Sequence, residues 1–215
     1  ATAARAAAAI TLGKEVISAY ADYEQLVGGV ETLFKDSSGK VMEYANDAYK
    51  TAGLSANEYM ETVTGFSASL ISSLGGDTEK AAKYADMAIT DMSDNANKMG
   101  SDMASIQNAY SGFAKQNYTM LDNLKLGYGG TKEEMQRLLE DAEKLSGVKY
   151  DISSYSDIID AIHVIQTEMD ITGTTAKEAE ATISGSIGML KSSFQNLITG
   201  LGDADADIDK LCDNV

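Results

Sequence analysis

Proline is absent from the 215 residues of this chain. A protein of this length would contain about 11 prolines at an average usage of about 5%. Proline breaks helix interiors because it lacks an amide donor and clashes with the preceding turn. Tryptophan is also absent, and no segment shows the alternation of β-branched residues that is typical of strands. These absences favour an all-α chain and argue against a β-rich fold.

Cysteine is limited to Cys212, so no disulfide can form within the chain, which agrees with a reducing compartment. Long apolar runs are missing as well. The alanine-rich opening, residues 1–10, is too short for a membrane span, is interrupted by Arg5 and lacks a signal-peptide cleavage pattern. We therefore expect no membrane span in this segment. Because the chain begins with alanine rather than methionine, we also expect it to be part of a longer protein.

Positive charge is scarce. The chain has 17 basic and 33 acidic residues, and its net charge is −16. This balance argues against direct binding to nucleic acid, whose phosphates would be repelled. It suits a well-solvated helical surface or a basic partner. The hydrophobic share of 44% is ordinary for a folded protein, so disorder is not expected.

What the chain does contain is a succession of amphipathic helices separated by glycine-containing breaks. The short breaks favour antiparallel hairpins packed into a bundle. We predict an all-α fold with little or no strand. It is either divided near the glycine-rich stretch 117–131 into regions 1–117 and 118–215, or forms one helical domain of a longer protein. The expected helices span about 3–35, 40–52, 56–74, 78–99, 101–113, 131–146, 155–170 and 176–200.

Local signals place the starts and stops of these helices. Three segments have the spacing of a capping box, in which a hydroxyl and a glutamate satisfy free amides: Ser55–Glu58, Thr131–Glu134 and Thr175–Glu178. Glycines are expected to end the helices. Within the first helix, Gly28 and Gly29 mark either a kink or a close helix crossing. The first clear break is predicted at residues 37–39.

The predicted helices carry apolar faces at helical spacing. The stripes of the last three include Leu145, Met169 and Phe194. The face of helix 78–99 is small and methionine-rich, which permits adaptable packing and offers a surface for self-association. Its members are Ala81, Ala85, Ala88, Met92, Ala96 and Met99.

Two glycine-rich patterns resemble functional motifs, but neither has the full spacing or setting of its motif. Residues 127–132, GYGGTK, resemble a phosphate-binding loop, but the P-loop spacing and a preceding strand are missing. A helix stop followed by a capped restart is the favoured interpretation. Residues 184–188, SGSIG, loosely match a nucleophile elbow, but they fall within a helical stripe, so small-residue packing is favoured there.

The acidic run Asp203, Asp205 and Asp207 has the alternation that begins an EF-hand calcium loop. Ile208 stands where the loop needs glycine, and Asn214 stands where it needs a bidentate glutamate. Acidic residues near a helix N-terminus explain the run more simply, so calcium binding stays an open question.

The single histidine, His163, has no cysteine or second histidine to share a metal, and a packed or rim histidine is expected. Among the many carboxylates, none stands out as a pair in an apolar setting. We therefore predict no catalytic, cofactor-binding or metal residues, and no enzymatic activity in this segment.

Residues 118–201 form the most identifiable block of the chain. The most specific strings of the sequence are ADYEQLVGGVETLF (21–34), MASIQNAYSGF (103–113), LKLGYGGTK (124–132), and AIHVIQTE (161–168) running into GTTAKE (173–178). In these strings the chain closely resembles the tail tape measure proteins of tailed bacteriophages and prophages of Gram-positive bacteria. None of the strings is a catalytic motif.

The resemblance implies that the parent protein occupies the tail tube, sets tail length during assembly and leaves ahead of the DNA. Self-association, the tail tube protein, tail-assembly chaperones and baseplate or tail-tip proteins are the implied partners. The implied location is the virion tail, and the host cytoplasm during assembly. The same family occurs in phage-tail-like bacteriocins.

Two other classes of function remain open at this point. The chain could be a generic helical interaction module, or an enzyme embedded in a phage protein. A length ruler should be extended, and one helix of this length would reach about 320 Å at about 1.5 Å per residue. The glycine breaks instead favour a compact helical module of a longer ruler, or a store that extends within the tail.

Overall fold

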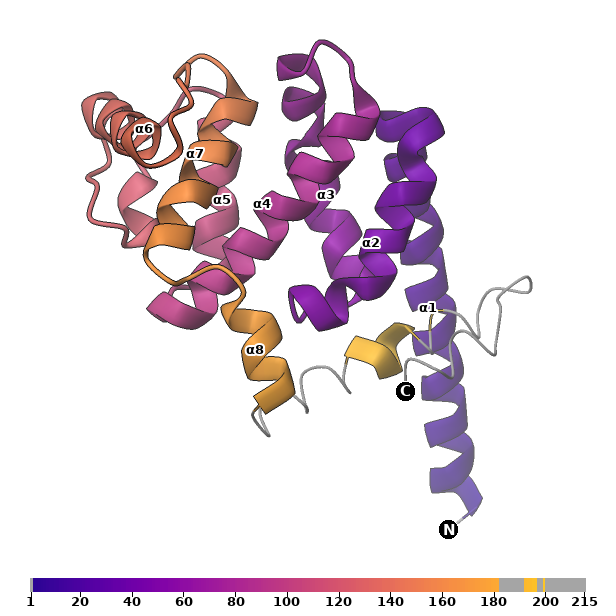
Figure 1. Cartoon of the computed structure of the whole chain (residues 1–215). Helices are drawn as coiled ribbons and strands as arrows, with labels where there is room; N and C mark the ends of the chain where they lie inside the picture. The colour runs from indigo at the N-terminus through magenta and orange to yellow at the C-terminus, as the bar shows by residue number, and fades with distance from the viewer. Residues whose placement is uncertain (1, 182–191, 197–198, 200–215) are drawn as a thin grey trace.

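The structure is a computed structural model, and it describes residues 2–181, 192–196 and 199. Within that part the chain forms eight α-helices and two 3₁₀ turns, with no strand (Figure 1). The predicted all-α class is therefore confirmed. The elements are α1 (Thr2–Phe34), η1 (Lys35–Ser37), α2 (Ser38–Thr51), α3 (Ala56–Ser73), α4 (Thr78–Met99), α5 (Met103–Phe113), η2 (Leu121–Leu124), α6 (Lys132–Ser146), α7 (Tyr155–Glu168) and α8 (Thr174–Ala181).

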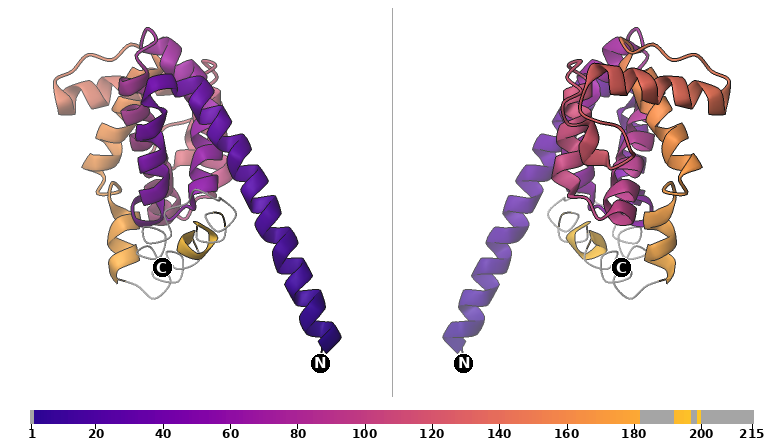
Figure 2. Two further views of the ribbon diagram at one scale, coloured as in Figure 1. Left: turned by 90° about the vertical axis from the view of Figure 1, so that its right-hand side faces the viewer. Right: turned by 90° about the vertical axis from the view of Figure 1, so that its left-hand side faces the viewer.

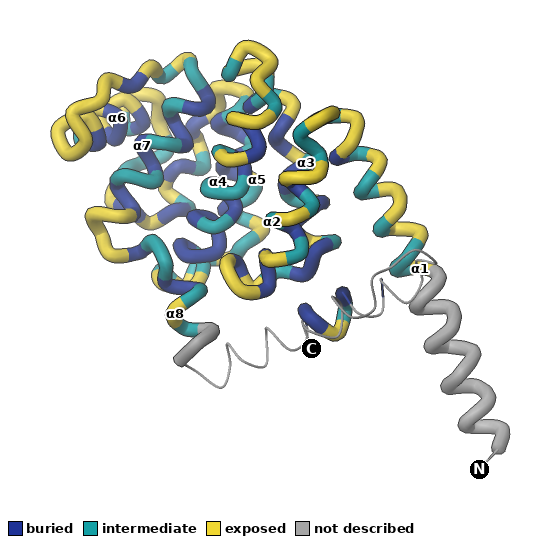
Figure 3. Tube along the Cα trace, turned by 45° about the vertical axis from the view of Figure 1, so that its right-hand side comes forward, coloured by how far each residue is buried: buried dark blue, intermediate teal, exposed yellow. Residues whose placement is uncertain are grey.

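Helix α4 lies at the centre of the fold and contacts α1, α2, α3, α5, α7 and α8. Its small face makes this possible, since Ala81, Ala85, Ala88 and Met92 are fully buried (Figure 3). Short side chains let neighbouring helix axes approach closely. The predicted use of this face for self-association is therefore wrong, because the face is already buried within the protomer.

The other helices surround α4 in two groups. On one side α1 and α2 pack against α3, and on the other side α6 packs against α7. Helix α1 contacts the body through its C-terminal half, where Val30 and Phe34 are fully buried. Its N-terminal half projects away from the body (Figure 2). Of the two alternatives predicted for Gly28 and Gly29, the structure supports the close helix crossing. Helix α1 is continuous there, it packs against α3, and a Cβ on Gly29 would lie 3.5 Å from the Thr64 side chain of α3.

Several local predictions of helix ends are confirmed. Ser55 and Glu58 form a complete capping box at the start of α3. Gly100 and Gly147 end α4 and α6 in the left-handed conformation, at φ 61° and 72°. The left-handed conformation is sterically unfavourable for residues with a Cβ atom, but not for glycine. Local spacing alone was sufficient to find these ends.

Other predicted ends are displaced. The break between the first two helices is a 3₁₀ turn at Lys35–Ser37, so Ser38 and Gly39 lie in the first turn of α2. Helix α5 begins after Asp102 rather than at Ser101, because the Asp102 carboxylate accepts the amide of Ser105. Serine and aspartate are both favourable N-cap residues, and here Asp102 caps α5 in place of the adjacent Ser101.

Two of the three predicted capping boxes are incomplete. Thr131 accepts the amide of Glu134, but the Glu134 side chain bonds the amide of Gly129 instead of that of Thr131. Helix α8 begins one residue before Thr175, which is not its cap. The amide of Thr175 is instead donated to a carboxylate of α4, Asp94.

Three residues predicted on inward faces are exposed. Leu145 is 48% exposed, Met169 is 41% exposed and Phe194 is 54% exposed. Leu145 lies in the last turn of α6, which extends beyond its neighbour α7 (Figure 2). Met169 follows the last residue of α7. Periodicity predicts which face of a helix is apolar, but it does not predict where the neighbouring helix ends.

Buried tyrosines tie the helices together through their hydroxyl groups. Tyr155 of α7 donates to the carbonyl of Tyr110 in α5, and Tyr59 of α3 donates to Asp86 of α4. The hydrophobic core cluster includes side chains from both sides of residue 117. The division into regions 1–117 and 118–215 stays a prediction. Within the described residues, no helix is long and apolar enough to cross a membrane.

Candidate functional site

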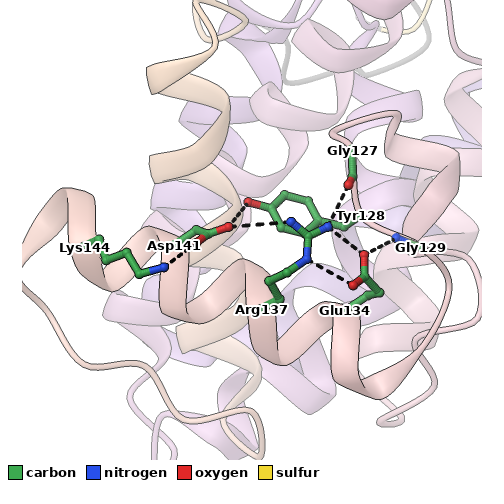
Figure 4. A network of polar contacts seen from close by, with 7 residues as sticks. All are labelled: Gly127, Tyr128, Gly129, Glu134, Arg137, Asp141 and Lys144. Carbon is green, nitrogen blue, oxygen red and sulfur yellow. Dashed lines mark hydrogen bonds and ion pairs between the residues drawn. The ribbon is translucent and has the colours of Figure 1, made fainter.

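The glycine-rich loop before α6 is held on that helix by Arg137 (Figure 4). The guanidinium donates to the carbonyl of Gly127 (Nη2 to O, 2.8 Å) and to both oxygens of Glu134 (3.0 and 2.7 Å). It also lies over the Tyr128 ring, 4.3 Å from the centroid. A planar guanidinium suits this combination of a forked ion pair and an aromatic contact. One side chain thus fixes the loop against the first two turns of α6.

One backbone donor of the loop is already engaged within the protein. The amide of Gly129, which a bound phosphate would need, is donated to Glu134 at 2.9 Å. The Arg137 guanidinium and this amide lower the pKa of Glu134 to about 2, so the carboxylate is charged at neutral pH. An anion approaching the loop would meet that negative charge. The geometry agrees with the interpretation of residues 127–132 as a helix stop and restart.

A second part of the same network anchors the aromatic ring of the loop. The Tyr128 hydroxyl donates to Asp141 at 3.0 Å, and Lys144 donates to the other oxygen of that carboxylate at 2.8 Å. Burial and the hydrogen bond to Asp141 raise the pKa of Tyr128 to about 12. The tyrosine therefore stays protonated and acts as a donor. Beside it, Gly130 approaches Thr119 so closely that a Cβ would lie 2.2 Å from the Thr119 carbonyl oxygen.

The second candidate site is a buried polar network along α4. Its outermost member is Asp91, 1% exposed, which pairs with Nδ1 of His163 on α7 at 2.9 and 3.0 Å. The hydrogen bond to Asp91 raises the pKa of His163, while burial raises the pKa of the Asp91 carboxyl. The prediction of a packed or rim histidine is confirmed, since His163 pairs with Asp91 of α4 while 33% of its side chain stays exposed.

One turn further along α4, amide side chains extend the network. Asn95 donates to the backbone carbonyl of Leu124 at 2.9 Å and to the side-chain oxygen of Gln166 at 2.7 Å. Gln166 in turn donates to the carbonyl of Asp91 at 3.1 Å. Both amides are fully buried. Buried networks of this kind favour one relative arrangement of helices, here of α4, α7 and η2. Within the described residues the side-chain oxygen of Asn95 is buried and accepts no hydrogen bond.

Asp94 completes the network and caps α8 from a distance. The carboxylate is fully buried and accepts the amides of Gly173 at 2.6 Å and Thr175 at 2.8 Å. These are unpaired donors at a helix N-terminus, where a negative charge is favoured. The preceding loop is also bound, since the carbonyl of Gln166 accepts the amide of Ile171. The start of α8 thus takes its cap from α4, beside local bonds such as that from Thr174 to the carbonyl of Ile171.

Sequence reasoning found His163 but missed its partners. Asp91, Asp94 and Asn95 are spaced three and four residues apart and flank Met92, which was assigned to the apolar face of α4. Three polar residues beside an apolar stripe are the signal that could have revealed them. Which side chain on α7 would face them depends on the packing of two helices distant in sequence.

The hydrogen bonds of this network join helices to one another. Every hydrogen bond of the His163 side chain within the described residues goes to Asp91, so no hydroxyl or thiol there is aligned as a nucleophile. No group of three metal-binding side chains occurs in the same part of the chain. Residues 184–188, the acidic run 203–207 and Cys212 lie outside the described residues.

Comparison with models of protein families, with curated proteins and with solved structures found no match to this chain. In the described residues, the side chains of both networks hold helices and loops in place.

Proposed function

We propose that this chain is a structural segment of a phage tail tape measure protein, which sets tail length during assembly and occupies the tail tube until ejection. The observation that carries the proposal is the resemblance of the strings at 21–34, 103–113, 124–132 and 161–178. The all-α fold supports it, since a protein that fills a tube needs helical building blocks and no catalytic cleft.

The positions of these strings in the fold add support. The first string is the part of α1 that contacts the body, with Val30 and Phe34 buried. The string 124–132 contains the loop held by Arg137, and the string 161–168 contains His163 and Gln166. The strings therefore coincide with residues that build the fold, as expected for a structural protein.

Partners and location belong to the same proposal. The proposed partners are further copies of the chain, the tail tube protein, the tail-assembly chaperones, and the baseplate or tail-tip proteins. The proposed location is the tube lumen of the virion tail, after assembly in the host cytoplasm. The net charge of −16 supports partners other than nucleic acid, because phosphates would be repelled.

Electron microscopy of tails tests the ruler role. An in-frame deletion of this segment from the parent gene should shorten the tails, by at most about 320 Å if the segment spans the tube as one helix. A matched control replaces the segment with an equally long, designed helical sequence, which should restore much of the length. Unchanged tail length in the deletion would reject the ruler role.

Two cheaper observations separate this proposal from its alternatives. Genes for tail tube and tail-assembly chaperone proteins beside the parent gene would support a tail protein over a generic helical interaction module. Capsid genes in the same neighbourhood would distinguish a phage from a phage-tail-like bacteriocin. A peptidoglycan-release assay addresses the enzyme alternative, and release of fragments by the 215-residue chain would overturn the proposed non-enzymatic role.

A further inference from the structure

A cavity of 430 Å³ lies where the ends of three helices meet, and the proposed function does not use it. It is bordered by the last turns of α3, by the C-terminal end of α5, and by the start of α7 with the loop before it. At its edge the amide of Ser156 donates to the Ser73 hydroxyl at 3.1 Å, which joins α7 to α3. A volume of 430 Å³ falls within the range of about 300–1,000 Å³ that is typical of small-molecule sites.

The cavity is neutral, although the chain is strongly charged. Among the described residues that line it none is charged, whereas charged residues make up 23% of the chain. Serine hydroxyls and a glutamine amide form its exposed rim, and the deeply buried side chains of Phe113 and Ile158 form its floor. A charged ligand would find no counter-charge there. A neutral ligand with polar edges and an apolar face would match both parts of the cavity.

Two hydroxyls of α3 at this rim have no protein partner. Thr62, Thr64 and Ser67 of the same helix donate to carbonyls one turn earlier, a bond that hydroxyl side chains commonly make in helices. Ser69 and Ser72, which border the cavity, make no side-chain hydrogen bond within the described part of the chain. Because they are three residues apart, they lie on one face of α3. They therefore leave two hydroxyls side by side for a ligand.

The third unpaired group of the rim belongs to a residue in an unfavourable backbone conformation. Gln116 follows α5 at φ 58°, in the left-handed region that glycine occupies at the ends of α4 and α6. Glutamine is not among the residues enriched in that region. Its side-chain amide borders the cavity and makes no hydrogen bond to the described residues. The backbone gives no reason for glutamine at this position, whereas a polar ligand would use its amide.

We propose that this cavity binds one ring of a neutral sugar. The hydroxyls of Ser69 and Ser72 and the amide of Gln116 can each donate and accept hydrogen bonds, as the hydroxyls of a sugar do. The apolar side of the ring would lie toward Phe113 and Ile158. The ligand is a free monosaccharide or the end residue of a longer glycan, which share this chemistry. The proposal does not depend on the tape measure assignment.

The test titrates sugars into the full 215-residue chain and follows its backbone amides by nuclear magnetic resonance. The neutral probes are the methyl glycosides of glucose, galactose and mannose, and N-acetylglucosamine. Glucuronate and glucosamine are charged probes of similar shape. We expect saturable shifts with at least one neutral sugar, first at amides that border the cavity, and weaker binding of both charged probes. A cello-oligosaccharide that binds more tightly than methyl glucoside would identify the end of a glycan as the ligand, and equal affinities a free sugar.

Matched variants locate the binding. Ser72→Leu fills the rim and should abolish saturable binding, whereas Ser18→Leu, at an exposed serine of α1, should change it by less than about twofold. Gln116→Gly and Lys35→Gly both replace a residue in the left-handed conformation, which glycine adopts without strain, so both should keep the thermal stability of the wild type. Only Gln116→Gly should weaken binding, by about threefold or more. Ser69→Ala removes a hydroxyl without adding bulk, and gives the same test if Ser72→Leu fails to fold.

Three outcomes would overturn the proposal. The first is no saturable shift with any neutral sugar, and the second is an equal loss of binding in the cavity variants and their controls. The third is glucosamine binding as tightly as the neutral sugars, in the wild type and in Ser72→Leu alike. That result would mean that the net charge of −16 attracts the amine without a site.

Discussion

The effect of a substitution in this fold depends on the contacts of the individual residue. Gly129 and Gly130 are adjacent in the loop before α6, yet only one of them is sterically required. A Cβ on Gly129 would lie 3.5 Å from the Glu134 side chain, an ordinary contact, whereas a Cβ on Gly130 would overlap the Thr119 carbonyl. In the buried network the requirement is chemical instead, because Asp91 is almost fully buried and His163 is its hydrogen-bond partner.

The two glycines predict opposite results for the same substitution. Gly130→Ala should lower the unfolding free energy by about 2 kcal/mol, because backbone atoms must move apart to admit the methyl group. Gly129→Ala is the matched control, and its effect should stay within about 0.5 kcal/mol. Urea denaturation followed by circular dichroism measures both. Equal values for the two variants would contradict the close approach to Thr119.

Asp91 and His163 predict a dependence of stability on pH. The carboxylate, aided by Asp160 and Asp94, raises the pKa of His163 above its ordinary value of 6.5. A raised pKa in the folded state means that the pair stabilises the fold fully below pH 6.5, and less as pH rises through the folded value. His163→Ala should therefore cost most at pH 6, by about 2 kcal/mol given the partial exposure of the ring, and less at pH 9.

Thermal or urea unfolding at a series of pH values measures this difference. Asp91→Asn serves as the partner variant, since it removes the charge that raises the pKa and should flatten the same part of the profile. Parallel profiles for wild type and His163→Ala between pH 6 and 9 would show that the pair does not titrate there.

The helices differ in where their end signals come from. Helices α3 and α4 are capped by the residue directly before them, Ser55 and Asp77. Helix α8 receives its cap from Asp94, which is distant in sequence and lies in the middle of α4. A local cap forms with the helix itself, whereas a remote cap forms only once the two helices have packed. We therefore expect α8 to depend on α4.

Asp94→Ala tests this dependence. The substitution leaves the amides of Gly173 and Thr175 without their acceptor in a buried place, and should cost about 2 kcal/mol of unfolding free energy. Amide hydrogen exchange at those two residues should accelerate more than exchange within α3. Asp77→Ala is the control, because it removes one exposed cap bond, to Lys80, and should cost about 1 kcal/mol. A smaller loss for Asp94→Ala than for Asp77→Ala would contradict the remote cap.

As a whole, the described chain is a compact helical body from which one helix projects. The body surrounds α4, and the N-terminal half of α1 extends away from it (Figure 2). A ruler built from such bodies would gain less length per residue than one built from a single helix. Under the proposed tape measure role, the compact form favours a folded module of a longer ruler, or a store that opens during assembly.

Small-angle X-ray scattering distinguishes these shapes in solution. A compact domain of this length has a radius of gyration of about 17 Å, and the projecting helix should raise it only to about 20–25 Å. A single rod-like helix of the same chain would give about 90 Å, from a length of about 320 Å. A value near that of the rod would reject the compact module.

Much of the fold followed from the sequence alone. The absence of proline, the spacing of apolar residues and the Ser55 capping box determined the helical class and most helix bounds, because these signals act within one or two turns of the chain. The packed state of His163 was also predictable from its isolation. The spacing of residues does not predict which side chains of distant helices contact one another.

Tertiary packing alone decided the remaining features. It buried the face of α4 that appeared suited to self-association, paired Asp91 with His163, and supplied Asp94 as the cap of α8. Each of these depends on the relative positions of helices far apart in sequence. Periodicity specifies the apolar side of a helix, but only the packed arrangement determines its neighbour and the polar groups buried between them.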